Sequence, residues 1–244
     1  MIELPEKFEF LREQIEKTFR HTIELKFVDI QTKPWESKLG GCPYLKDKSD
    51  YPLDREGDPM MFLAQINFAE MPEMENFPQK GILQFYVVND ESYGYDEPCK
   101  VIYIEDYITD ETKLLSENPY QNEIQENLPF EKNTKIIFNS TYMPITQYEN
   151  ELDSLINNIN DEDEDEFYDL LYGAGSRIGG YPCFVQNPVP CYDNGEKDIL
   201  LLQLDEDSVA DIMFGDSGNC QFFISKKDLI NKDFSDVVYD WACC

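Results

Sequence analysis

The sequence predicts an α+β fold in which two antiparallel β-units, produced by internal duplication, are related by a pseudo-twofold axis, with helices at the periphery. The first observation is a set of four apolar blocks that occur twice in the same order. The second is that these blocks are short, as buried strands are. The third is helical spacing of apolar residues outside the blocks. We expect one compact domain over residues 1–244.

The repeated blocks carry most of this prediction. In order, Gly40–Pro43, Leu63–Ile66, Gly81–Val87 and Val101–Tyr103 recur as 179–182, 201–204, 218–224 and 237–239. The order is kept and the offset changes by one residue from block to block, so chance is a poor explanation. Repeat unit one therefore covers about 22–105 and repeat unit two about 135–241, with Gln65 equivalent to Gln203 and Tyr103 equivalent to Tyr239.

The first elements along the chain are a helix and a strand. Residues 5–20 have apolar side chains three or four positions apart, which predicts a helix with one buried stripe. Pro5 suits the first helical turn. From Thr22 to Val28 apolar and polar residues alternate, which predicts a strand.

The rest of the chain fits the duplicated plan. Unit one continues with a Gly-Gly turn and three strands, predicted at 38–43, 60–66, 81–88 and 100–105. Residues 106–134 are acidic and loop-like, and mark the seam between the halves. Residues 135–138 predict a strand equivalent to 22–28. Unit two ends with the second copies of the blocks.

A helical insert at about 146–172 distinguishes the second half from the first. Inside it, residues 161–166 are six consecutive acids. A calcium loop is one interpretation, but such loops need a glycine at the sixth position, where this chain has Glu166. We therefore predict a solvated loop between two helices that is exposed, mobile and dispensable for folding.

Charge limits the partners. The chain has 50 acids and 20 bases, for a net charge of −30. Nucleic acid and anionic membranes need clustered Lys and Arg, so neither is expected as a partner. A basic protein partner is favoured by the opposite charge. The plainer interpretation is a soluble cytoplasmic surface.

Cysteine usage and the N-terminus point to the cytoplasm. Seven cysteines without a CxxC pair do not form a secreted disulfide framework. Cys42, Cys183 and Cys220 lie in apolar blocks and fit small core residues. The terminal Cys243-Cys244 pair fits a frayed tail better than a redox site. The chain begins without an apolar signal segment and has no run long enough to span a membrane.

Catalytic motifs are scarce. The segment Gly215-Asp216-Ser217-Gly218 is similar to the nucleophile box of chymotrypsin-type proteases, but it lacks the second glycine after the box. The single histidine, His21, has no motif around it, so Ser-His chemistry would depend on it entirely. We predict a turn before a strand here, and no catalytic residue, metal or cofactor. Carboxylate-only catalysis and a carboxylate site for magnesium or calcium stay open.

Five residues are candidates for a cleft between the units. Lys38 and Arg177 each stand two residues before a glycine pair, where backbone N–H groups could hold an anion. A structural corner is the favoured interpretation, because proline rather than a helix follows. Gln65 and Gln203 occupy equivalent apolar strands, as buried hydrogen-bonding groups or as cleft residues. Asp216 lies in the turn before the last repeated strand.

The sequence resembles the YwqG-like family of bacterial proteins, a domain of unknown function. The resemblance runs from about residue 20 onward. The segments that carry it are Lys38–Gly41, Phe62–Asn67, Gly81–Phe85, Ile178–Pro182, Leu202–Leu204, Phe214–Asp216 and Asp233–Ser235. It implies an α+β fold, a bacterial cytoplasmic setting and no established catalytic residue. Some relatives look like members of toxin–immunity neighbourhoods. Phe214 departs from the Trp that relatives often carry.

Two functions follow as hypotheses. The first is a non-enzymatic protein-binding module, with an immunity-type inhibitor of a basic toxin as its specific form. The alternative is a small-molecule-binding module, or an enzyme with a carboxylate-based site, in the cleft between the repeats.

Overall fold

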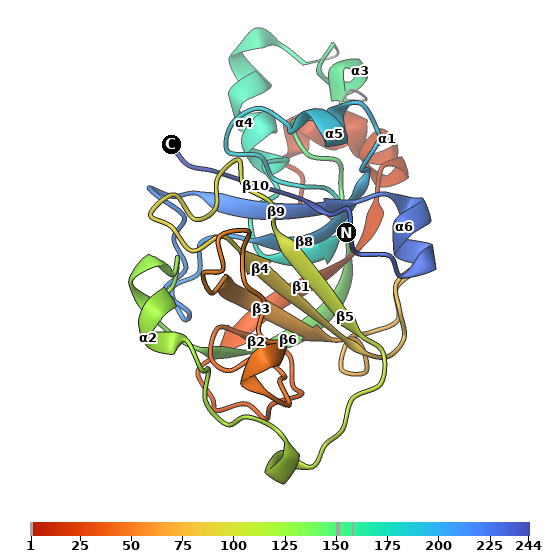
Figure 1. Cartoon of the computed structure of the whole chain (residues 1–244). Coiled ribbons are helices and arrows are strands. Elements are labelled where there is room, and N and C mark those ends of the chain that lie inside the picture. Colours follow the sequence, from red (N-terminus) through yellow and green to blue (C-terminus); the bar gives the residue numbers. More distant parts are fainter. Residues whose placement is uncertain (1, 150–151, 158) are drawn as a thin grey trace.

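A single antiparallel sheet of ten strands organises the computed structural model, which describes residues 2–149, 152–157 and 159–244 (Figure 1). The strands follow one another across the sheet in the order β10-β9-β8-β7-β1-β6-β2-β3-β4-β5. Their bounds are β1 Arg20–Val28, β2 Lys38–Leu39, β3 Met61–Asn67, β4 Ile82–Val87, β5 Lys100–Ile104, β6 Thr134–Met143, β7 Arg177–Gly179, β8 Ile199–Leu204, β9 Asn219–Ile224 and β10 Val238–Ala242.

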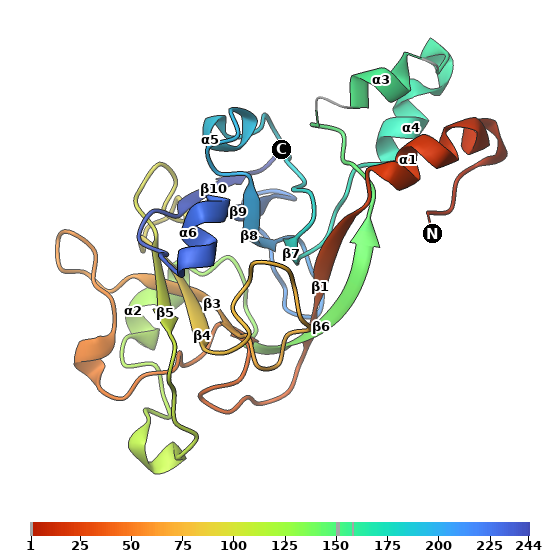
Figure 2. The ribbon, with the colours of Figure 1, turned by 90° about the vertical axis from the view of Figure 1, so that its right-hand side faces the viewer.

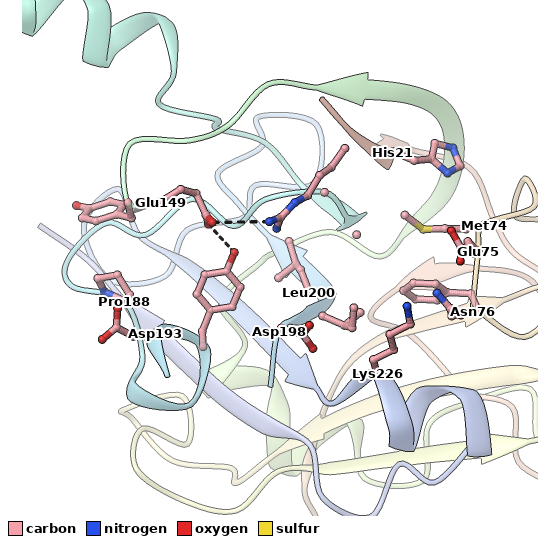
Figure 3. A pocket seen from close by; sticks show the side chains of 17 residues that line it. His21, Met74, Glu75, Asn76, Glu149, Pro188, Asp193, Asp198, Leu200 and Lys226 are labelled. Atoms are coloured by element: carbon pink, nitrogen blue, oxygen red, sulfur yellow. Dashed lines mark hydrogen bonds and ion pairs between the residues drawn. The ribbon is translucent and has the colours of Figure 1, made fainter. Parts of the chain in front are cut away.

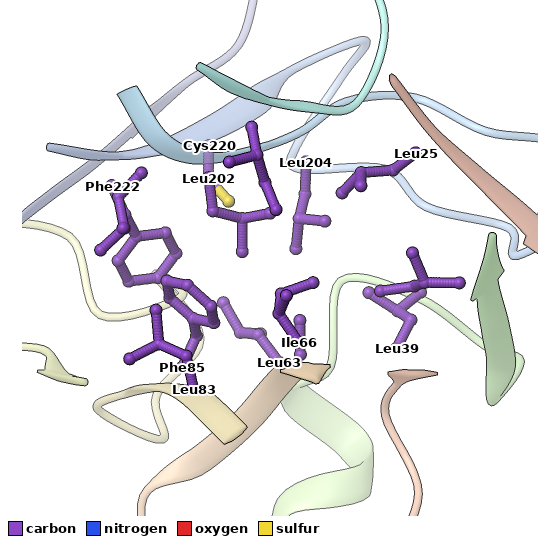
Figure 4. Close-up of a cluster of buried hydrophobic side chains, with 14 of the residues drawn as sticks. Leu25, Leu39, Leu63, Ile66, Leu83, Phe85, Leu202, Leu204, Cys220 and Phe222 are labelled. Atoms are coloured by element: carbon purple, nitrogen blue, oxygen red, sulfur yellow. The ribbon is translucent and has the colours of Figure 1, made fainter. Parts of the chain in front are cut away.

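The sheet curls into a half-barrel whose two wings face each other across the main core (Figures 1 and 2). β3 and β4 on one wing and β8 and β9 on the other supply buried side chains to this core (Figure 4). The rings of Phe85 and Phe222 meet there, with centroids 4.9 Å apart. β3, β4 and β9 are buried along their whole length and β8 at every residue except Ile199, so burial of apolar surface holds the wings together.

The β1–β6 ladder joins the two wings. β1 pairs with β6 along nine consecutive positions, from Arg20 with Met143 to Val28 with Lys135. β7 pairs with the other side of β1, and β2 pairs with the other side of β6. The wing of the second half is therefore joined to β1 of the first half, and the wing of the first half is joined to β6 of the second half.

The strand registers match between the wings. Gln65 pairs with Gln84 on one wing, and Gln203 pairs with Gln221 on the other. An irregularity centred two residues before the first glutamine of each pair interrupts β3 between 62 and 64 and β8 between 200 and 202.

The predicted equivalence of Tyr103 with Tyr239 does not hold in these ladders. Tyr103 pairs with Leu83, one residue before Gln84, whereas Tyr239 pairs with Phe222, one residue after Gln221. The two tyrosines therefore differ by two positions: the sequence equivalence made the connection before the last strand one residue shorter in the second half, whereas the ladders make it one residue longer.

The helices lie outside the sheet: α1, α3 and α4 form a lobe beyond the upper end of β1 and β6, and α2, α5 and α6 lie apart from it (Figure 2). The N-terminal segment is a 3-10 helix that continues into an α-helix, rather than one helix over 5–20. The bounds are η1 Glu6–Leu11, α1 Arg12–Lys17, α2 Gln121–Ile124, α3 Asp153–Ile156, α4 Glu164–Leu170, α5 Pro190–Asp193 and α6 Lys226–Asn231. Residues 150, 151 and 158 of the predicted insert lie outside the described residues.

The N-terminal helix and the helical insert pack against each other. Phe8, Leu11 and Ile15 form a second buried cluster with residues of the insert that include Phe167. The rings of Phe8 and Phe167 lie 5.2 Å apart. This cluster is separate from the main core, so the lobe has an apolar interior of its own.

The acidic segment is not the predicted loop. Residues Asp161–Asp163 form a 3-10 turn, and Glu164 begins α4. Negative charge is favourable at a helix start, where backbone N–H groups point outward. The side chains stay exposed or half-buried, as expected, but Lys7 Nζ lies 2.6 Å from both Asp163 Oδ1 and Glu166 Oε2.

Two further boundaries differ from the prediction. The seam at 106–134 contains short helical turns, among them η3 (Glu111–Lys113), α2 and η4 (Gln125–Asn127). The strand predicted at 135–138 extends from Thr134 to Met143, because its full length pairs with β1.

We expect that replacing all six acids at 161–166 with Asn and Gln changes the free energy of unfolding by no more than about 1 kcal/mol. Removal of like-charge repulsion offsets the loss of exposed pairs to Lys7, which are individually weak. The control is Phe167→Ala, for which we expect a loss of about 3–5 kcal/mol. Urea unfolding at low salt measures both, and a loss from the acid replacements as large as that control would contradict the expectation.

Candidate functional site

Lys38 is buried and held by backbone carbonyls. Its Nζ donates hydrogen bonds to the carbonyl oxygens of Lys33 (2.7 Å), Cys42 (3.1 Å) and Pro34 (3.3 Å). An ammonium group has three donors, so these contacts satisfy it. Burial nevertheless lowers the pKa of Lys38 to about 8. The side chain clamps the two ends of the Gly-Gly turn together.

Arg177 does the same in the other wing. Its guanidinium donates to the carbonyl oxygens of Tyr181 (3.1 Å), Gly173 (2.5 Å) and Ala174. Tyr181 follows Arg177 by four residues, just as Cys42 follows Lys38. The same cation–carbonyl arrangement therefore closes both Gly-Gly turns.

The glutamines complete these two corners. Gln65 Oε1 accepts from Tyr44 N at 2.7 Å, and its Nε2 donates to the carbonyl oxygens of Pro34 and Glu36. Gln203 Oε1 accepts from Cys183 N at 2.8 Å, and its Nε2 donates to the Gly175 carbonyl oxygen. Both amides are fully buried and hydrogen-bonded, as a stable interior requires.

The structure brings the five predicted residues together only in pairs. Lys38 lies opposite Gln65 in one wing, and Arg177 lies opposite Gln203 in the other. Asp216 is exposed in the turn before β9, where its carbonyl oxygen accepts from Cys244 N at 3.1 Å. The five residues therefore do not line one shared cleft.

A groove between the halves forms elsewhere (Figure 3). Its volume is about 440 Å³, within the usual range of ligand pockets. One wall is the 74–77 loop of the first half, and the opposite wall comes from β8, α5 and the start of α6. The first two residues of β1, Arg20 and His21, and the Gly179-Gly180 turn form the floor. Glycine is favoured at Gly179, because its φ of +67° is a backbone conformation that residues with a Cβ rarely adopt.

An ion pair and a tyrosine occupy one end of the groove. Tyr192 Oη donates to Glu149 Oε1 at 2.5 Å, and Arg20 Nη2 lies 4.0 Å from Glu149 Oε2. The Arg20 guanidinium stacks 3.8 Å from the centre of the Tyr181 ring. Burial, together with the charge of Glu149, raises the pKa of Tyr192 above its ordinary range. Tyr192 therefore stays protonated and donates to the carboxylate.

His21 lies at the other end, paired with a hydroxyl. Its Nε2 lies 2.8 Å from Ser140 Oγ, and its ring contacts Tyr142 at 5.2 Å. This is the Ser-His contact on which nucleophilic catalysis would depend. Among the described residues no carboxylate hydrogen-bonds the second ring nitrogen. The base therefore lacks the orienting group that such sites use.

Charged side chains without partners also line the groove. Among the described residues, the carboxylates of Glu75, Asp193 and Asp198 form no hydrogen bond or ion pair, and neither does Lys226 Nζ. In Figure 3, Lys226 extends from α6 into the space between Asp198 and Asn76. None of these residues belongs to a sequence motif, so no pattern in the sequence pointed to them.

A second feature lies at the edge strand β10. The Tyr95 ring, more than half exposed, lies 6.2 Å from the Trp241 ring. Burial and the negative charge of Asp96 raise the pKa of Asp240. A hydrogen bond from the backbone N–H of Trp241 lowers it, but by less. We call Tyr95, Asp96, Asp240 and Trp241 the β10 edge surface. It combines exposed aromatic area with an uncompensated negative charge.

A model of a protein family described as a domain of unknown function (DUF1963) matches residues 37–243. No curated protein matches the chain. Within the described residues, no helix has both the length and the apolar character to cross a bilayer.

We expect Lys38→Met and Arg177→Met each to lower the free energy of unfolding by about 1–3 kcal/mol, because buried carbonyl oxygens lose their donors. Only Lys38→Met should also alter the pH dependence. Between pH 8 and the ordinary lysine pKa of 10.5, Lys38 binds more protons in the unfolded chain than in the native one, so its own contribution to stability rises with pH. The raised pKa values of the buried thiols of Cys42, Cys99 and Cys183 act in the opposite direction and are common to all three proteins. The difference in stability between wild type and Lys38→Met should therefore grow with pH, whereas that between wild type and Arg177→Met, the control, should stay constant. Denaturant titrations across this window measure both differences, and a constant difference for Lys38→Met would refute the assignment.

Proposed function

The chain belongs to the DUF1963 family, whose function is unknown, and we propose that it is a non-enzymatic protein-binding module with a basic partner. The observation that carries this proposal is the excess of acids that the fold leaves without counter-charges. Its consequence is a strong negative field, which speeds the approach of a basic protein.

The bases in the described part of the chain are largely occupied. Eleven of them form ion pairs: Lys7, Arg12, Lys17, Arg20, Lys33, Lys80, Lys113, Lys132, Lys135, Lys197 and Lys232. Lys38 and Arg177 are buried against carbonyl oxygens. With 50 acids against 20 bases, most of the acidic surface has no cation within the chain.

The β10 edge surface is our candidate for the contact. Asp240 is partly desolvated already, so pairing with a partner's Lys or Arg would relieve an existing cost. Tyr95 and Trp241 offer aromatic faces for the same cation. Tyrosine and tryptophan also dominate the energy of many interfaces.

We further propose that the protein acts in a bacterial cytoplasm as an immunity-type inhibitor of a basic toxin. This is the specific form of binding module that the YwqG-like resemblance suggests. The charge argues against nucleic acid and anionic membranes as partners.

We also propose that the chain is one domain built from two duplicated units. The register supports this. Glu24, which pairs with Arg177, and Lys135, which pairs with Lys38, lie symmetrically about the Lys26–Ile137 pair of the β1–β6 ladder. An experimental structure with that ladder shifted by one residue would break the symmetry and contradict the proposal.

The test of binding is capture of a basic protein from the native cell extract at low and at high salt. We expect retention at low salt that falls steeply as salt rises, because steering by opposite charge is screened. Asp96→Asn combined with Asp240→Asn should reduce capture about tenfold, the effect of losing about 1.4 kcal/mol of binding free energy.

The matched control is Glu123→Gln with Glu126→Gln, which removes the same charge from an exposed site on α2 and η4. Equal losses in both double variants would mean that only net charge matters, and would remove the β10 edge surface from the proposal. Failure to retain any basic protein at low salt would remove the proposed function itself.

A further inference from the structure

From the unpartnered charges of the groove we infer a second binding site, for a small α-amino acid with a cationic side chain, such as lysine or arginine. This site is separate from the β10 edge surface and does not depend on a protein partner. The groove, about 440 Å³, admits a ligand of this size.

The signs of the free charges select the ligand class. Three carboxylates, Glu75, Asp193 and Asp198, and one ammonium, Lys226, line the groove without partners in the described part of the chain. A basic amino acid carries one carboxylate and two cationic groups. Its carboxylate complements Lys226, and its cations complement two of the acids. A simple anion would meet three repelling carboxylates, and a simple diamine would leave Lys226 unpaired.

The apolar lining fits the aliphatic part of such a ligand. Met74, Phe77 and Leu200 are buried side chains of the groove wall. In Figure 3, Leu200 on β8 and Met74 on the opposing loop lie among the charged groups. Phe77 belongs to the same loop as Met74. Lysine and arginine stems pack along apolar surface while their charged ends stay in polar surroundings.

Several of the other polar groups of the groove are already engaged. Glu149 accepts from Tyr192 and lies beside Arg20, and His21 is hydrogen-bonded to Ser140. These contacts fix the end walls in place before a ligand arrives. A preformed site loses less entropy on binding.

The test is calorimetric titration of the full chain with L-lysine and L-arginine. The comparison ligands are L-norleucine, which lacks the side-chain cation, and cadaverine, which lacks the carboxylate. We expect lysine or arginine to bind at least about tenfold more tightly than either comparison ligand, because each of those loses one charge contact.

Variants locate the site. Asp198→Asn and Lys226→Met should each weaken binding about tenfold. The controls Asp216→Asn and Lys227→Met make the same charge changes outside the groove, and should bind as the wild type does. Asp96→Asn with Asp240→Asn should also leave amino-acid binding unchanged. Melting temperatures without ligand show whether each variant folds.

Three results would overturn the inference: no heat of binding with either basic amino acid, equal affinity for norleucine or cadaverine, or unchanged binding in folded Asp198→Asn and Lys226→Met. None of these results would affect the proposed binding of a basic protein, because the capture experiment tests the β10 edge surface and not the groove.

Discussion

The β1–β6 ladder holds the two halves of the chain in one relative position, and both wings of the sheet attach to it. Nine paired positions fix how one half of the chain lies against the other. β2 pairs with β6 and β7 pairs with β1, so each wing is hydrogen-bonded to a strand from the other half of the chain. A slip of one residue would turn every side chain of β1 or β6 to the other face. It would remove Ile23, Leu25 and Phe27 from the main core.

The buried polar groups follow from that geometry. Each wing turns sharply at a Gly-Gly pair next to the ladder, and the turn leaves carbonyl oxygens pointing inward. A buried cation, Lys38 or Arg177, and a buried glutamine satisfy them. Lysine in one corner and arginine in the other can fill the same role, because the buried carbonyl oxygens need only hydrogen-bond donors and no particular donor geometry. Residues that look functional in the sequence are thus needed to close the corners.

The sequence predicted the antiparallel strands well and the site poorly. Alternation and apolar runs depend on local burial, so β1, β3, β4, β8 and β9 were found close to their true bounds. The acidic segment was misassigned because repulsion among its six carboxylates was given more weight than the favourable position of acids at the start of a helix. Its pairing with Lys7 joins residues 156 or more positions apart, which no local pattern indicates. The groove could not be predicted, because its lining residues come from six separate segments of the chain. Only the three-dimensional arrangement brings Arg20, Glu149 and Lys226 to one place, and none of them stands in a repeated block.

The groove lies where the two halves differ. The ladder register that relates Glu24 to Lys135 also relates Arg20 to Glu131 and His21 to Lys132, so the end walls of the groove have no chemical counterpart in the other half. α6, which supplies Lys226, follows β9, whereas a loop without a helix follows β4. The shared features, the glutamines and the cation-closed corners, are structural. The binding chemistry that we propose for the groove therefore lies at positions where the two halves differ, on strands that have matching registers in both.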